Sequence, residues 1–77
     1  MTDDVKAKLK AIITEIAEID DVPEDTPFVD LGIDSMMAIE IVSDVEREFQ
    51  ISIDENELSD LTNFRAVLDK VQDKLAN

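Results

Sequence analysis

Apolar residues recur at the spacing of one helix face in three stretches of this 77-residue chain, and this pattern constrains the fold most strongly. Residues three and four positions apart lie on the same side of an α-helix, so each stretch predicts an amphipathic helix. The apolar positions are Val5, Leu9, Ile12, Ile13 and Ile16 within residues 4–18; Met37, Ala38, Ile41, Val42, Val45 and Phe49 within residues 35–49; and Phe64, Val67, Leu68, Val71 and Leu75 near the end. Such helices bury their apolar faces against one another, which predicts an all-α bundle.

The first connection, residues 19–34, is long and holds both prolines. Loops of this length in a compact domain usually pack or function, so we expect a pinned surface loop with a short turn at residues 23–26. The apolar residues that predict its packing are Val22, Phe28, Leu31 and Ile33.

The second connection contains the alternating pair Ile51 and Ile53, but the chain offers no second strand to pair with it. We therefore expect an extended loop over the core. A short helix capped by Asp54 follows, ending near residue 60 or 61, and Thr62 is expected to cap the last helix. The expected fold is a four-helix bundle, with three longer helices, a short third helix and a long loop between the first two, forming one domain over residues 1–77.

Composition removes several classes of function. The chain has no histidine and no cysteine, so a Ser-His-Asp or Cys-His catalytic arrangement, a thiolate metal site and a disulfide are excluded. Its net charge of −13 repels nucleic acids and anionic membrane surfaces and attracts basic protein surfaces. The amino-terminal residues are acidic and lack a secretory apolar segment. We expect a cytoplasmic, monomeric protein with no metal site and no catalytic residue of its own.

Ser35 is the most informative single residue. It lies where the long loop ends and the second helix begins, directly after Asp34 and three residues after Gly32, the only glycine. We expect Asp34 to be the N-cap of residues 35–49. By position alone, Ser35 is then merely part of this cap, in which Asp34 or Ser35 satisfies free N–H groups. A serine at a helix start also suits an attached phosphate, because the N–H groups and the helix dipole point toward it.

The stretch DLGIDSMMAIEIVSDVEREF resembles the phosphopantetheine attachment region of acyl carrier proteins in fatty acid and polyketide synthesis. The matching positions are Asp30, Leu31, Gly32, Asp34, Ser35, Met36, Ile39, Glu40, Ile41 and Val42. The resemblance implies that a phosphopantetheinyl transferase attaches 4′-phosphopantetheine from coenzyme A to Ser35, with Mg²⁺. It also implies a carrier without catalytic activity, whose partners are an acyltransferase, a ketosynthase and other synthase enzymes with basic docking patches.

Residues beside Ser35 have two interpretations each. In the resembled family Asp34 helps to position the metal and the transferase; otherwise it is only the cap. Met36 and Ile39 follow Ser35 by one and four positions and share a face with it, where they contact partners or belong to the core.

The acidic residues also have two interpretations. Between Glu15 and Asp60 there are sixteen acids and one base, Arg47, and such a run is usually only a solvated face. The resemblance implies that Glu40 and Glu46 on the second helix bind basic partner surfaces, with Asp44 and Glu48 contributing less.

Two questions stay open in the sequence. An acyl cavity between the last three helices has the candidate lining Val42, Ile53, Leu58, Leu61 and Val67, but we expect a closed core. In the resembled family a fatty-acid carrier typically has Ala at the position of Ile33 and Leu at the position of Met36, so the resemblance implies a carrier of a polyketide or other specialised pathway. The alternatives are a D-alanyl or peptidyl carrier, or a noncatalytic acidic helical interaction module in which Ser35 is only a cap.

Overall fold

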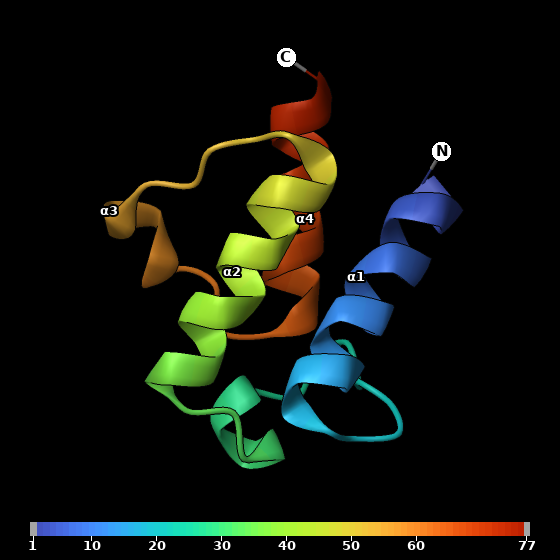
Figure 1. The fold of residues 1–77 in the computed structure, drawn as a ribbon, viewed down its shortest axis with the longest axis vertical. Helices are drawn as coiled ribbons and strands as arrows, with labels where there is room; N and C mark the ends of the chain where they lie inside the picture. The colour runs from blue at the N-terminus through green and yellow to red at the C-terminus, as the bar shows by residue number, and fades with distance from the viewer. Residues whose placement is uncertain (1, 77) are drawn as a thin grey trace.

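The computed structural model describes the backbone of residues 2–76 and the side chains of residues 4–76. Its helices are α1 (Thr2–Ala17), the 3-10 helix η1 (Phe28–Leu31), α2 (Ser35–Phe49), α3 (Glu55–Leu58) and α4 (Phe64–Ala76). The described residues form no strand, and their only β pairing is an isolated bridge between Pro27 and Asn63. The predicted all-α bundle is therefore confirmed (Figure 1). No helix among residues 2–76 is long and apolar enough to cross a membrane.

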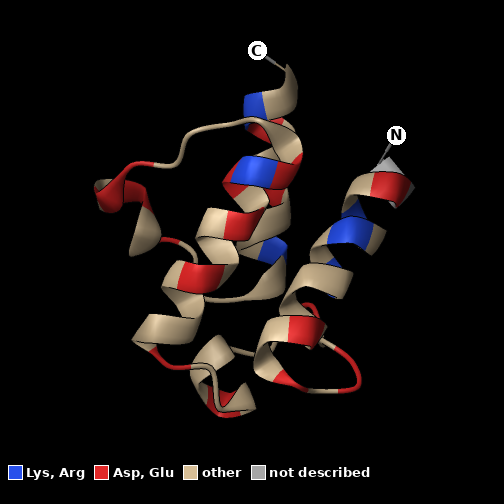
Figure 2. Ribbon diagram, in the orientation of Figure 1, with Lys and Arg blue, Asp and Glu red and all other residues tan. Residues whose placement is uncertain are grey.

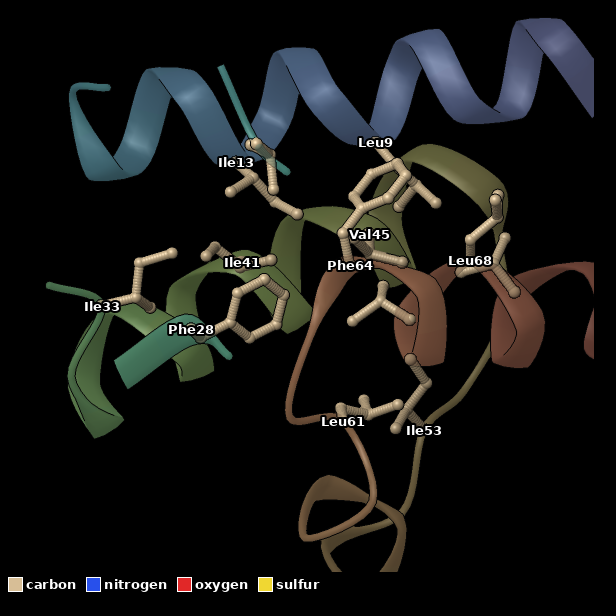
Figure 3. Close-up of a cluster of buried hydrophobic side chains, with 13 residues drawn as sticks. Leu9, Ile13, Phe28, Ile33, Ile41, Val45, Ile53, Leu61, Phe64 and Leu68 are labelled. Atoms are coloured by element: carbon tan, nitrogen blue, oxygen red, sulfur yellow. The ribbon is translucent and has the colours of Figure 1, made fainter. Parts of the chain in front are cut away.

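The core lies where α1, α2 and α4 meet (Figure 3). Leu9 and Ile13 of α1 and Phe64 of α4 are fully buried, and Ile41 of α2 is nearly so. These are positions that the helical periodicity predicted. The other core residues are Val22, Phe28, Ile33, Val45, Ile53, Leu61, Val67, Leu68 and Val71. Among the described residues the core holds no buried polar or charged side chain, so burial of apolar surface is its main source of stability.

The long loop packs as predicted, through buried Val22, Phe28 and Ile33. It bends at residues 24–26, within the expected turn, and adds the unpredicted helix η1. Three ion pairs hold the bend to the helices: Lys6 Nζ lies 2.6 Å from Glu24 Oε2, Arg65 Nε lies 2.7 Å from Asp25 Oδ1, and Arg65 Nη2 lies 3.7 Å from Glu24 Oε1. The loop is thus fixed to both α1 and α4.

The same ion pairs shift the titration of the loop acids. The Lys6 ammonium, through its hydrogen bond, lowers the pKa of Glu24, and the Arg65 guanidinium lowers the pKa of Asp25 in the same way. Both side chains therefore favour the charged form in the folded state.

Two predicted helix ends are corrected by the structure. The short helix α3 does begin after Asp54, but it ends at Leu58 rather than near residue 60 or 61. The last helix is capped by Asn63, whose Oδ1 accepts the Ala66 N–H at 2.8 Å, and not by Thr62. Thr62 instead uses its carbonyl to accept the Phe28 N–H at 2.8 Å, which ties the two loops together.

Residues 51–54 form the predicted extended loop. Ile53 is buried, and its backbone N–H donates to Glu46 Oε2 at 2.8 Å. The Glu46 side chain of α2 therefore accepts a loop N–H that a neighbouring strand would otherwise pair with.

Candidate cofactor attachment site

Ser35 is the first residue of α2 and is exposed to solvent. Asp34 is the N-cap: its Oδ1 accepts the Met37 N–H at 2.9 Å, as the sequence predicted. The cap is thus made by Asp34, and the Ser35 hydroxyl is left on the surface. The N–H groups of Ser35 and Met36 open the helix and have no acceptor within it. They lie beside the hydroxyl, so the site suits a phosphate attached there.

Gly32 makes the approach to Ser35 possible. Its φ of 79° lies in the left-handed region, where a side chain is strained. The turn is closed by the Gly32 N–H, which donates to Val29 O at 3.2 Å, and by the Ile33 N–H, which donates to Phe28 O at 3.0 Å. Ile33 then points into the core, with 6% of its surface exposed, and the chain emerges at Asp34.

An apolar cleft of about 300 Å³ opens beside Ser35. This size is at the low end of the range for small-molecule sites, about 300–1,000 Å³. The lining comes from η1, α2, α3, the segment after α3 and α4: Phe28, Ser35, Ala38, Ile39, Ile41, Val42, Leu58, Ser59, Leu61 and Val67. None of these residues is charged, so the cleft suits an uncharged, largely apolar group.

The cleft contradicts the closed core that we expected from the sequence. Four of the five candidate lining residues do line it, namely Val42, Leu58, Leu61 and Val67, whereas Ile53 does not. The reason is that none of the α3 residues is buried: this helix stands beside the bundle instead of filling the space next to α2. Phe28, Ala38, Ile39, Ile41 and Ser59 were not predicted as lining.

Three apolar side chains near Ser35 are exposed: Val29 by 76%, Met36 by 75% and Ile39 by 57%. Ile39 lines the cleft with Ser35, and Val29 lines a shallower hollow that also includes Ser35. Met36 and Ile39 are therefore not core residues. Sequence reasoning missed Val29, although a 3-10 turn of three residues places Phe28 and Leu31 on one side and Val29 on another. We name Val29, Met36 and Ile39 the apolar patch.

The acids of α2 differ in what they contact. Glu40 is exposed and makes no ion pair with a described residue. Asp44 Oδ1 lies 3.5 Å from Arg47 Nη1, and Glu48 Oε2 lies 3.4 Å from Lys8 Nζ. Glu46, in contrast, is partly buried and holds the Ile53 N–H.

The basic residues lie mainly on α1 and α4, whereas acids mark the long loop, α2 and α3 (Figure 2). The helix that begins at Ser35 carries four acids and one base, Arg47. Within the described part of the chain no group of three or more acids is arranged to hold a metal ion by itself.

The family model for the phosphopantetheine attachment site matches residues 7–71. Among curated proteins, the citrinin polyketide synthase of Monascus ruber is 37% identical over 71 residues, which are 90% of this chain but only 3% of that protein. The chain thus spans a small part of this much longer relative. The polyketide-8 synthase acyl carrier protein 2 of Streptomyces avermitilis is 29% identical over 75 residues, covering 94% of this chain and 86% of that protein.

Solved structures agree in fold. An acyl carrier protein from Thermotoga maritima superposes with a TM-score of 0.84 at 30% identity, covering 97% of this chain and 91% of that one. BlmI, a type-II acyl carrier protein from Streptomyces verticillus, gives a TM-score of 0.85 at 24% identity, covering 96% and 89%. Because the family model spans most of the chain, and the fold and the relatives agree with it, the chain belongs to the acyl carrier protein family, whose members bear phosphopantetheine.

Proposed function

We propose that Ser35 Oγ is the atom to which 4′-phosphopantetheine is attached. The observation that carries this proposal is the place of Ser35: exposed, first in α2, and at the edge of an uncharged cleft. When attached, the group supplies a terminal thiol that holds acyl intermediates as thioesters, in polyketide or fatty acid biosynthesis. The polyketide subtype is favoured by the relatives from polyketide synthases.

The chain's own residues orient the attachment point. The free N–H groups of Ser35 and Met36 stabilise the phosphate charge, and the cap made by Asp34 fixes the first turn. We propose that Asp34 has a second role during modification, because its carboxylate is exposed beside the hydroxyl and can bind the Mg²⁺ that a phosphopantetheinyl transferase brings.

The apolar patch and the exposed Glu40 form the proposed docking surface for partners. An acyltransferase, a ketosynthase or the transferase must reach Ser35, so each must cover the residues that surround it. A partner surface with an apolar centre and basic residues around it is complementary to the apolar patch and Glu40. Small interfaces of this kind suit a carrier that binds each enzyme only briefly.

The cleft is the proposed resting place of the acyl group. It borders Ser35 and has no charged lining, so it excludes water from an apolar chain without desolvating a charge. We also propose that residues 1–77 form one carrier domain and that the protein is monomeric and cytoplasmic.

The test of the proposal is peptide mapping by mass spectrometry after incubation with coenzyme A, Mg²⁺ and a broad-specificity transferase. The phosphopantetheine is expected on the peptide that contains Ser35. Modification at Ser43 or Ser59 instead, both of which are exposed serines, would refute the assignment.

A further inference from the structure

The short helix α3 forms one wall of the cleft, although little of the helix is buried. None of its residues, Glu55–Leu58, is buried. Leu58 and the following Ser59 nevertheless line the cleft beside Ser35. Leu58 is only partly buried where it packs against the core, so we expect contacts besides core packing to help set the position of this wall.

Two anchors flank α3. Ile53 on one side and Leu61 on the other are both 8% exposed and belong to the core. The Ile53 backbone is held as well, because its N–H donates to Glu46. Residues 54–60, which we name the flap, therefore span two fixed points, and α3 lies between them (Figure 3 shows both anchors).

One carboxylate fixes the middle of the flap. Glu57 Oε2 accepts the Asp54 N–H at 2.8 Å and lies 3.2 Å from Lys74 Nζ, while Glu57 Oε1 lies 3.2 Å from Lys70 Nζ. Lys70 and Lys74 are four residues apart on α4, so both ammonium groups come from one face of that helix. The Asp54 N–H first, and then the two lysines, lower the pKa of Glu57 from 4.5 to about 2.

We propose that Glu57 is a positioning residue for the cleft: by pairing with Lys70 and Lys74 it closes the flap and sets how far Leu58 reaches into the cavity. Leu58 follows Glu57 directly, so release of the carboxylate moves this wall. The inference rests on the proposed function only in assigning the acyl group to the cleft. The closing of the flap itself is a property of the unmodified chain.

The test is amide hydrogen exchange, measured by NMR on the full unmodified chain. Glu57→Gln removes the charge that the lysines bind, and Glu55→Gln is the matched control, because Glu55 is exposed on the same helix without an ion pair to a described residue. In Glu57→Gln we expect exchange at Asp60 and Leu61, whose N–H groups close the end of the flap, to rise roughly fivefold. The Ile41 and Val45 amides in α2 should keep their wild-type rates.

A second pair of substitutions tests the same contact from α4. Lys70→Gln with Lys74→Gln should raise flap exchange like Glu57→Gln, and combining all three should add little, because the contact is already lost. The double variant of Lys70 and Lys74 tests the proposal if Glu57→Gln fails to fold. Global loss of protection in both variants would overturn the proposal, and so would flap exchange in Glu57→Gln that matches Glu55→Gln.

Ser35→Ala separates this inference from the proposed function. It should abolish modification and leave flap exchange unchanged. Conversely, Glu57→Gln should still be modified at Ser35. A failed attachment assay therefore refutes the site, and a failed exchange assay refutes only the role of Glu57.

Discussion

Asp34 Oδ1 accepts a hydrogen bond from the Met37 N–H at 2.9 Å, and this contact assigns the cap of α2 to the residue before Ser35. A capping serine turns its hydroxyl back toward the helix backbone, where it is occupied. Because Asp34 fills that role, the Ser35 hydroxyl is available at the surface. The relationship explains why two adjacent polar residues are needed at one helix start.

The two roles proposed for Asp34 predict different effects of two substitutions. Asp34→Ala removes the cap and should lower the free energy of unfolding by about 1 kcal/mol, which corresponds to roughly 4–8 °C in melting temperature for a domain of this size. Asp34→Asn keeps a good capping oxygen, so its melting temperature should stay near that of the wild type, but its modification by the transferase should slow. Modification of Asp34→Asn at the wild-type rate would show that Asp34 is only a cap.

The apolar patch predicts a loss of partner function without a loss of stability. Val29→Ala combined with Met36→Ala removes two exposed side chains, so the free energy of unfolding should change by less than about 0.5 kcal/mol per site. Acyl loading by a partner synthase enzyme should slow about fivefold or more, because an apolar contact next to Ser35 is lost. Leu75→Ala is the control, since Leu75 is exposed near the carboxyl end of α4, away from Ser35. Equal slowing in the control would remove the patch from the docking surface.

Glu40 and Glu46 are predicted to respond differently to charge reversal. Glu40→Lys should slow loading by a partner with a basic surface, most strongly at low ionic strength, and leave the melting temperature unchanged. Glu46→Lys also removes the acceptor of the Ile53 N–H, so it should lower the free energy of unfolding by about 1 kcal/mol. Glu15→Lys on α1 controls for net charge. If Glu15→Lys slows loading as much as Glu40→Lys, only overall charge matters.

The contacts of Glu57 predict a pH dependence. Its pKa is lowered from 4.5 to about 2 in the folded state, so its stabilising contribution is complete above the unfolded value and is lost as the pH falls toward 2. Urea denaturation of the wild type and of Glu57→Gln should therefore differ most at about pH 7 and progressively less below about pH 4.5. A difference that stays constant over this range would mean that the carboxylate charge contributes nothing.

Much of the fold follows from the sequence because helix periodicity and capping are local signals. Residues 35–49 and their Asp34 cap were predicted correctly for this reason. The cap of α4 was misassigned because Thr62 and Asn63 are both good capping residues. Only the structure shows that α4 begins at Phe64 and that Asn63 Oδ1 accepts the Ala66 N–H.

The cleft and the apolar patch were harder to predict because both depend on packing between distant segments. Whether Val42 and Leu58 enclose a space depends on where α3 stands, and ion pairs between Glu57 and α4 fix that position. Val29 was missed because its exposure results from an unpredicted 3-10 turn. The family resemblance pointed to Ser35 as the expected attachment residue. The residues that surround Ser35 in space could be identified only from the structure.

Intact mass spectrometry of the wild type and Ser35→Ala tests the central claim most directly. Both proteins are incubated with coenzyme A, Mg²⁺ and a broad-specificity transferase, after circular dichroism has shown that Ser35→Ala is folded. We expect one phosphopantetheine adduct on the wild type and none on Ser35→Ala. An unmodified wild type, or an adduct that persists in Ser35→Ala, would contradict the account.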